Sequence, residues 1–354
     1  MGKERTQAPL AHAKERERTV PRTTLVTGGA GFIGSNFIRR LLAGENDIRV
    51  INLDKLTYAG RLENLASVAD DPRYRFVKGD IADPQLVNEL FKDGIDDVVN
   101  FAAESHVDRA ITDPGHFITT DVYGVYVLLE AAREHGVRRF IQISTDEVYG
   151  SVETGSSTET DPLMPRNPYA ASKAGGDRLA YSYFATYGLD VIVTRASNNY
   201  GPYQYPEKFV SLFATNAVED KELPLYGDGR NVRDWLHVDD HCDAIRFVIE
   251  HGESGEIYNI GGGNERENIE VARLICDELG KPQSLIHLVK DRLGHDRRYS
   301  LDAAKLAALG WTPTVPFEAG LRATVRWYAD NRTWWEPIKS GEFRDYYLKH
   351  YGNR

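Results

Sequence analysis

The sequence contains very little sulfur, with two cysteines and two methionines among 354 residues. Cys242 and Cys276 form no CxxC motif and follow no repeating spacing, which argues against a disulfide framework and against a zinc site of the usual cysteine type. Such cysteine usage is typical of a reducing compartment. We therefore expect a cytoplasmic location and no bound metal.

The sequence also lacks long apolar stretches and an excess of positive charge. No run of about 18 apolar residues occurs, which predicts no transmembrane helix. Residues 1–20 hold many charges and no apolar core, so we expect a disordered extension there rather than a signal peptide. The net charge of −10 argues against nucleic acid or an anionic membrane as the main partner. An anionic ligand would have to be held by local cations and backbone amides.

Strand-like and helix-like segments alternate between residues 23 and 195. Repeated βα units of this kind predict an α/β fold with a doubly wound, Rossmann-type parallel sheet over residues 21–200. The alternation loosens after about Gly201, which predicts a smaller C-terminal lobe over residues 201–354, partly interleaved with the sheet. The expected strands are 23–27, 48–54, 74–78, 97–101, 140–144, 191–195, 231–237 and 257–260, and the expected helices are 32–43, 84–92, 116–135, 168–187, 207–219, 239–251, 269–279 and 317–331.

A glycine-rich turn follows the first predicted strand directly. Gly28, Gly31 and Gly34 form a GxxGxxG pattern, which lets the backbone approach a pyrophosphate at a helix N-terminus. Asp54 ends the second predicted strand, and an acid about 20 residues after such a turn suits the ribose hydroxyls of NAD and repels the extra phosphate of NADP. Lys55 could weaken that exclusion. A turn without a ligand would look similar alone, but strand, helix and acid together predict a dinucleotide site.

Three polar residues follow the predicted strand at 140–144. Thr145, Asp146 and Glu147 stand where the carboxyl end of a parallel strand would present them to a ligand. One hydroxyl and two acids in different environments suit proton transfer. From this stretch alone, a polar loop in which Asp146 caps the next element is an equally good interpretation.

A tyrosine and a lysine lie four residues apart at the start of the next predicted helix. Tyr169 and Lys173 therefore share one helix face. A lysine beside a tyrosine lowers the pKa of the phenol, which can then accept a proton from an alcohol during hydride transfer. A solvated contact between the two side chains is the alternative, but their position after the strand ending in Ser144 favours catalysis.

Together these features resemble the extended short-chain dehydrogenase/reductase family over nearly all of the chain from about residue 22. Within that family, the Asp146–Glu147 pair is the most specific feature and resembles the members that dehydrate nucleotide sugars, because the related epimerases lack this pair. The motifs that carry the resemblance are GGAGFIGSNF (28–37), LDKLTYAGRLENL (53–65), FAAESHVDRAI (101–111), STDEVYG (144–150), YAASKAGGD (169–177), RASNNYGPYQYPEK (195–208), PLYGDGRNVRDWLHVDD (224–240) and DRLGHDRRY (291–299).

The resemblance implies an NAD-dependent dehydration of dTDP-glucose to a 4-keto-6-deoxy sugar. Tyr169, assisted by Lys173, would deprotonate the 4-hydroxyl as hydride leaves C4, and Thr145 would bond the same oxygen. Glu147 would then remove the C5 proton, and a protonated Asp146 would donate to the departing 6-hydroxyl. Hydride would return to C6, so the cofactor should be held tightly.

The resemblance also implies which residues line each ligand. For NAD these are Gly28, Gly31, Phe32, Ile33, Gly34, Asp54, Lys55, Leu56, Thr57, Asp80, Ile81, Phe101, Ala102, Ala103, Glu104, Ser105, Thr120, Tyr169, Lys173 and Asn199. For the nucleotide sugar they are Ser105, Thr145, Asn198, Lys208, Phe209, Pro224, Leu225, Tyr226, Arg233, Asn268, Asp291, Arg292 and His295. Surface solvation or loop packing is the alternative for each residue of the second set.

Two further patterns remain open at this point. The run His237-Val-Asp-Asp-His241 looks like a metal cluster, but an incomplete ligand set favours the simpler interpretation that Asp239 caps a helix. The predicted helix at 116–135 is apolar beyond one stripe, and the resemblance favours a homodimer built on it and on the Tyr169 helix. Rival functions are a nucleotide-sugar 4-epimerase or decarboxylase, a dehydratase for another nucleotide, and a non-catalytic NAD-binding sensor.

Overall fold

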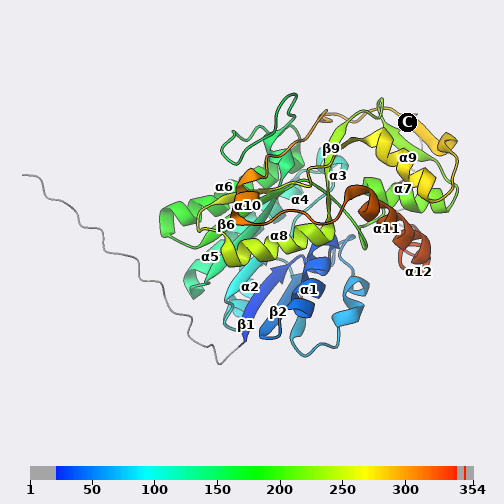
Figure 1. The fold of residues 1–354 in the computed structure, drawn as a ribbon. Helices are drawn as coiled ribbons and strands as arrows, with labels where there is room; N and C mark the ends of the chain where they lie inside the picture. Colours follow the sequence, from blue (N-terminus) through cyan, green and yellow to red (C-terminus); the bar gives the residue numbers. More distant parts are fainter. Residues whose placement is uncertain (1–20, 341–346, 348–354) are drawn as a thin grey trace, which may run out of the picture.

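The computed structural model describes residues 21–340 and Tyr347, so the predicted disordered extension at 1–20 lies outside the described residues. Seven strands form one sheet in which all neighbours run parallel, which confirms the predicted Rossmann-type α/β fold (Figure 1). Across the sheet the strands are β10 (Ile257–Ile260), β6 (Val191–Ala196), β5 (Arg139–Thr145), β4 (Asp97–Asn100), β1 (Arg22–Thr27), β2 (Ile48–Asp54) and β3 (Tyr74–Lys78).

Helices cover both faces of this sheet because its strands are apolar on both sides. In β1, for example, Leu25 packs into the core on one face and Val26 into the core on the other. One face is covered by α1 (Phe32–Gly44), α8 (Val238–His251) and α10 (Ala304–Leu309), and the other by α2 (Pro84–Phe91), α5 (Val125–His135) and α6 (Pro168–Tyr187).

The strand order reverses between β1 and β4. From β1 the chain builds outward through β2 and β3, and it then returns to β4 and builds the other way through β5 and β6. At such a reversal the loops after neighbouring strands separate, which leaves a crevice at the carboxyl ends of the strands. The glycine turn after β1 and the Thr145 stretch after β5 both lie at this edge.

A second group of elements forms the C-terminal lobe, drawn at the upper right of Figure 1 around α7, α9, α11 and α12. Its core is rich in aromatic side chains, including Phe213, Trp235 and Trp335. Its strands are β7 (Asn198–Tyr200), β9 (Val232–His237) and β11 (Glu265–Glu267) in one sheet and β8 (Leu223–Tyr226) and β12 (Ile286–Val289) in another, and its helices are α7 (Phe209–Val218), α9 (Asn268–Glu278), α11 (Phe317–Asp330) and α12 (Arg332–Trp335). A 3-10 helix lies at Leu62–Val68 and a single 3-10 turn at Gln283–Leu285.

The helix expected at 116–135 is present, but a π-helical turn at Thr119–Gly124 interrupts its α-helical hydrogen bonding. The turn joins α4 (Gly115–Ile118) to α5 without a gap, and the short α3 (Val107–Thr112) precedes them. The π turn contains buried Asp121, whose carboxylate accepts hydrogen bonds from the Glu104 amide and the Ser172 hydroxyl. These partners come from distant parts of the chain, so helical periodicity could not reveal the interruption.

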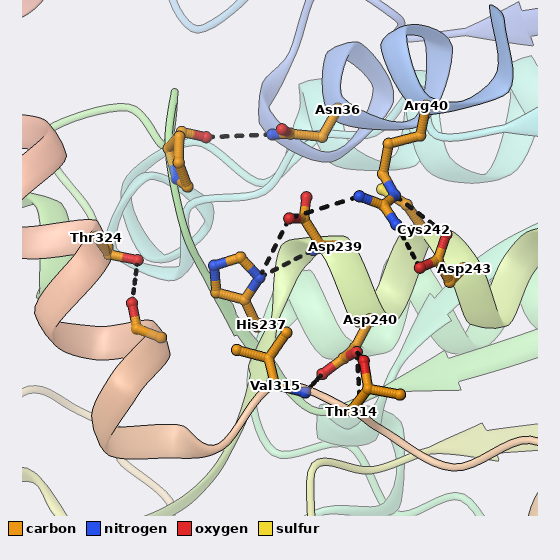
Figure 2. A network of polar contacts seen from close by, with 12 residues as sticks. Asn36, Arg40, His237, Asp239, Asp240, Cys242, Asp243, Thr314, Val315 and Thr324 are labelled. Carbon is orange, nitrogen blue, oxygen red and sulfur yellow. Dashed lines mark hydrogen bonds and ion pairs between the residues drawn. The ribbon is translucent and has the colours of Figure 1, made fainter. Parts of the chain in front are cut away.

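The start of α8 also differs from expectation, because Asp239 does not cap this helix. His237 is the N-cap residue, and its Nδ1 accepts a hydrogen bond from the Asp239 amide at 3.2 Å (Figure 2). The Asp239 carboxylate lies 3.5 Å from Arg40 instead. Asp240 accepts hydrogen bonds from the backbone of Thr314 and Val315, which tie α8 to the segment before α11. Within residues 21–340, no helix is long and apolar enough to cross a membrane.

Candidate active site

Two adjoining cavities lie at the carboxyl edge of the main sheet. The larger, of about 320 Å³, follows the ends of β1, β2, β4, β5 and β6, and we call it the sheet cavity. The smaller, of about 160 Å³, lies between that edge and the C-terminal lobe, and we call it the lobe cavity. Five residues line both cavities and form the wall between them: Ser105, Glu147, Asn198, Glu207 and Lys208.

The glycine turn forms one end of the sheet cavity. Gly28 has a φ of +66°, and a Cβ atom on Gly34 would lie 2.4 Å from the Gly28 carbonyl oxygen, so neither position accepts a side chain without strain. Gly31 is the N-cap of α1 and offers no side chain to the first amides of the helix. These amides therefore remain available to an anion at the cavity wall.

Asp54 lies at the end of β2 beside the same turn. Its two carboxylate oxygens accept hydrogen bonds from the amides of Ala30 and Leu56 at 2.9 and 2.8 Å. A carboxylate has about four acceptor sites, so it can also accept ribose hydroxyls. Burial raises the pKa of Asp54, and the two amide hydrogen bonds oppose this rise. The donor set of turn, amides and acid fits a dinucleotide such as NAD.

Lys55 forms an ion pair with an acid that follows the neighbouring strand, β3. Its Nζ lies 2.5 Å from the Asp80 carboxylate at the end of β3, so its charge is partly neutralised. Leu56, with a φ of +55°, does not line the sheet cavity. The other residues predicted for the cofactor all line it: Gly28, Gly31, Phe32, Ile33, Gly34, Asp54, Lys55, Thr57, Asp80, Ile81, Phe101, Ala102, Ala103, Glu104, Ser105, Thr120, Tyr169, Lys173 and Asn199.

The stretch after β5 places two acids in the sheet cavity. Thr145 is the N-cap of the 3-10 turn Asp146–Tyr149, and its hydroxyl oxygen accepts a hydrogen bond from the Glu147 amide. Asp146 is buried, and its Oδ2 has no hydrogen-bond partner among the described residues. Burial, and next the charge of Glu147, raise the pKa of Asp146 well above its usual value. This environment favours the protonated form of Asp146.

Glu147 is half-buried and has partners that the sequence did not indicate. Its Oε2 lies 3.3 Å from the Asn167 side-chain amide and 3.3 Å from the Tyr299 hydroxyl, which donates to Asp296 at 2.7 Å. The Arg233 guanidinium lies 4.2 Å from the centre of the Tyr299 ring. Asn167 precedes a proline at the start of α6, so only its role as a helix N-cap was readable from the sequence.

Tyr169 and Lys173 lie on the same face of α6, in the wall of the sheet cavity. Burial, and then the negative charges of Glu147 and Asp121, raise the pKa of Tyr169 well above 10. The expected lowering by Lys173 is therefore wrong for this structure, because the Lys173 ammonium instead donates to the Ile143 carbonyl at 2.8 Å. Burial lowers the pKa of Lys173 itself.

The lobe cavity brings together most of the residues predicted for the nucleotide sugar. Asp291 does not line it, but its carboxylate lies 2.6 Å from His295 Nδ1 and so orients that ring. Burial, with the charges of Arg292 and Arg233, lowers the pKa of His295 to about 4. Predicted residues that line the lobe cavity are Ser105, Asn198, Lys208, Phe209, Pro224, Leu225, Tyr226, Arg233, Asn268, Arg292 and His295, whereas Thr145 lines the sheet cavity.

Three of these lining residues, Lys208, Arg233 and Arg292, supply positive charge in an otherwise acidic chain. Such a group suits a diphosphate. His106 and Asp108 also line this cavity, although they were not predicted, because they lie on or next to the short α3 segment that the sequence did not indicate.

A family model described as GDP-mannose 4,6 dehydratase matches residues 25–324 of the chain. A dTDP-glucose 4,6-dehydratase of Streptomyces antibioticus is 55% identical over 321 residues, which cover 89% of this chain and 95% of that protein.

Two solved structures show the same overall fold. The dTDP-glucose 4,6-dehydratase DesIV of Streptomyces venezuelae, solved with NAD bound, is 55% identical with a TM-score of 0.88, over 90% of this chain and 100% of that one. The UDP-glucose 4-epimerase of Thermus thermophilus, in complex with NAD, is 33% identical with a TM-score of 0.81, over 87% of this chain and 99% of that one.

Proposed function

This chain belongs to the GDP-mannose 4,6 dehydratase family, and we propose that it acts there as an NAD-dependent dTDP-glucose 4,6-dehydratase. One observation carries the proposal: Asp146, Glu147 and Tyr169 line one cavity, directly beside the glycine turn and Asp54. A purely redox enzyme needs the tyrosine and the cofactor, but not two further acids. Elimination of water needs an acid and a base, which these two carboxyls supply.

Residues on β5 and α6 carry out the redox half of the reaction. NAD, when bound, accepts a hydride from C4 of the hexose and returns it to C6. Tyr169 accepts the proton of the 4-hydroxyl, and Thr145 donates a hydrogen bond to the same oxygen. Lys173 stabilises the phenolate by its positive charge once a ligand draws its ammonium away from the Ile143 carbonyl.

The elimination falls to the two acids. Glu147 removes the C5 proton, which the 4-ketone makes acidic, and Asn167 and Tyr299 hold its carboxylate in place. Asp146, favoured in its protonated form by burial and by the charge of Glu147, donates a proton to the leaving 6-hydroxyl. Asn198 lies in the wall between the cavities and faces the sugar.

The lobe cavity accounts for the nucleotide part of the substrate. Lys208, Arg233 and Arg292 neutralise the diphosphate, and Tyr226 packs against the base. The Tyr226 ring already lies edge-on to the His295 ring, at a centroid distance of 5.9 Å. Both rings belong to the C-terminal lobe, on β8 and after β12, whereas the two acids follow β5 of the main sheet.

Turnover across dTDP-, UDP-, CDP- and GDP-glucose tests the proposal, with no added reductant. We expect a 4-keto-6-deoxy product from dTDP-glucose and slower or no conversion of the other three. Formation of the galactose epimer instead would support the epimerase alternative, and binding of NAD without conversion of any sugar would support the sensor alternative.

We also infer a homodimer in the cytoplasm, built on α5 and α6. These neighbouring helices carry large side chains with unusually high exposure, including Tyr126 at 42% and Tyr187 at 57%. An apolar surface on two helices that pack side by side suits a second copy of the same surface. Cys242 and Cys276 are both buried and unbridged, which is compatible with reducing conditions.

A further inference from the structure

The wall between the two cavities contains a hydrogen bond that joins the loop after β2 to the segment before α7. We propose that this bond, between the Tyr58 hydroxyl and Glu207, is a latch that retains NAD while the nucleotide sugar enters and leaves. The inference rests on the proposed function, because it concerns the cofactor and substrate named there.

Most of the loop after β2 lines the sheet cavity, and the two residues that do not are Leu56 and Tyr58. Asp54, Lys55, Thr57, Ala59 and Gly60 all line this cavity, but Tyr58 in their midst does not. The Tyr58 hydroxyl instead donates to Glu207 Oε1 at 2.7 Å. Its side chain therefore points out of the cavity and anchors the loop from outside.

Neighbouring side chains hold the Tyr58 ring in that position. The Arg109 guanidinium lies 3.7 Å from the centre of the ring, and the Tyr205 ring meets it edge-on at a centroid distance of 5.3 Å. Both contacts come from outside the loop, on α3 and on the segment before α7. The hydroxyl thus has a fixed direction toward Glu207.

Glu207 is a rigid anchor for this loop. The residue is 6% exposed, and within residues 21–340 its Oε2 accepts no hydrogen bond but forms long ion pairs with Arg109 and His106, at 3.7 and 3.8 Å. Oε1, which accepts from Tyr58, is therefore the oxygen that is hydrogen-bonded. A buried carboxylate with so few partners makes the phenol bond hard to replace.

The segment that carries Glu207 is itself tied to the core. The Tyr328 hydroxyl donates to the Gln204 carbonyl at 2.6 Å, and the Gln204 side chain donates to the Asn199 carbonyl at 2.9 Å. Asn36 on α1 donates to the Pro202 carbonyl at 3.1 Å. The loop after β2 is therefore fastened to a fixed point rather than to a mobile one.

The proposed reaction explains why a hydrogen bond between Tyr58 and Glu207 would be useful to the enzyme. The cofactor is regenerated within each turnover and has no need to leave, whereas the nucleotide sugar must exchange through the lobe cavity. Glu207 lines both cavities, so it can hold the cofactor loop while the neighbouring site empties. Loss of one hydrogen bond to a carboxylate should speed NAD release about tenfold.

The test is the rate at which bound, labelled NAD exchanges with excess unlabelled NAD. Tyr58→Phe should release NAD about tenfold faster than the wild type. The rate of C4 oxidation, measured with the enzyme saturated with NAD, should change less than the rate of NAD release. The matched control is Tyr74→Phe, which loses a hydroxyl contact of 2.9 Å to Asn52 but touches neither cavity. This control should exchange NAD at the wild-type rate.

A second pair of variants keeps the test decisive if Tyr58→Phe folds poorly. Glu207→Gln retains a carbonyl oxygen for the phenol and should retain NAD better than Glu207→Ala. Wild-type exchange rates in Tyr58→Phe, or equal rates in the two Glu207 variants, would overturn the latch. A wild-type protein that binds no NAD, or leaves dTDP-glucose unchanged, would instead contradict the proposed function.

Discussion

Asp146 and Glu147 are adjacent in the chain but occupy different surroundings. Asp146 is buried with one oxygen lacking a partner, whereas Glu147 is half-buried and held by Asn167 and Tyr299. Because burial penalises the charged form, the first residue is suited to donate a proton. The second, half-buried and held by the Asn167 side-chain amide, is suited to accept one. This difference assigns the acid and the base in the proposed elimination.

Glu147→Gln should abolish removal of the C5 proton while leaving the substrate bound. The amide keeps the shape of the side chain but has no basic oxygen of comparable strength. Exchange of the C5 hydrogen with deuterated water, followed by mass spectrometry, measures this step. We expect at least about a hundredfold loss, since general base catalysis typically contributes about 10²–10⁴-fold. Unchanged exchange would show that Glu147 is not the base.

Asp146→Asn should slow the loss of water and remove a basic limb from its pH profile. In the wild type the raised pKa keeps Asp146 protonated above the usual range of an aspartic acid, and elimination should fall as the pH rises through that raised value. The asparagine cannot donate a proton as an acid, so its residual rate should not show this fall. The rate of elimination from dTDP-glucose, measured in single turnovers across pH for the wild type and for Asp146→Asn, checks this expectation.

At the scale of single residues, the sequence predicted which residues lie in the site better than it predicted which side chains contact them. Tyr169 and Lys173 are local signals, since a spacing of four places them on one helix face. Tyr299 lies 152 residues from Glu147, and no local pattern links the two. The pKa of Tyr169 was predicted in the wrong direction, because its burial and the position of the Lys173 ammonium depend on the complete fold.

At the scale of the elements, a buried ion pair joins β6 to α6, and a hydrogen bond from the same arginine joins both to the turn after β5. The Arg195 guanidinium donates to both carboxylate oxygens of Asp177, at 2.8 and 3.1 Å, and to the Tyr149 hydroxyl at 2.7 Å. Tyr149 ends the turn that carries the two acids, and its hydroxyl donates in turn to Asn259 on β10. This network therefore fixes the acidic turn relative to the sheet.

Arg195→Met should lower the free energy of unfolding by about 3–5 kcal/mol, because it removes the buried partner of the Asp177 carboxylate and leaves it only the more exposed Arg178. Urea denaturation at a fixed protein concentration measures the loss. The control is Arg75→Met, which removes an exposed ion pair with Asp93 and should cost about 0–1 kcal/mol. Equal losses in the two variants would contradict the role given to the buried pair.

Long, regular elements were predictable and short or irregular ones were not. The bounds of β2, β3, β10 and α6 agree with the sequence pattern because each has a clear apolar run or a helix cap. The strands β7 and β11 have too few residues for a period to be recognised, and a proline in β8 and a histidine in β12 interrupt their apolar pattern. The π-helical turn at Thr119–Gly124 is stabilised by Asp121, whose partners lie outside the helix.

At the scale of the whole molecule, the apolar surface on α5 and α6 is the surface on which we expect a second copy of the chain to bind. The double variant Tyr126→Glu/Tyr187→Glu should shift the proposed dimer to a monomer, because a charge on each helix would be buried opposite its own copy. Sedimentation velocity measures the change. Leu288→Glu, at an exposed apolar position on β12 in the C-terminal lobe, serves as the control. A dimer that persists in the double variant would place the interface elsewhere.

The doubly wound, parallel architecture followed from the alternation of strands and helices. The course of the chain through the C-terminal lobe did not. After β6 the chain builds β7, α7, β8 and β9 before α8 returns it to the main sheet at β10. The loosened alternation after about Gly201 indicated where the chain leaves the main sheet, but no pattern indicated where it rejoins the sheet.

This return has a consequence for how the molecule is made. β10 pairs with β6 from Ile257 to Ile260, so the edge of the sheet stays open until the whole intervening stretch has left the ribosome. Pairing of parallel strands across so long a loop is slow, and an open edge invites association with other chains. A nascent chain halted within this stretch should therefore depend on chaperones to prevent association through the exposed edge of β6.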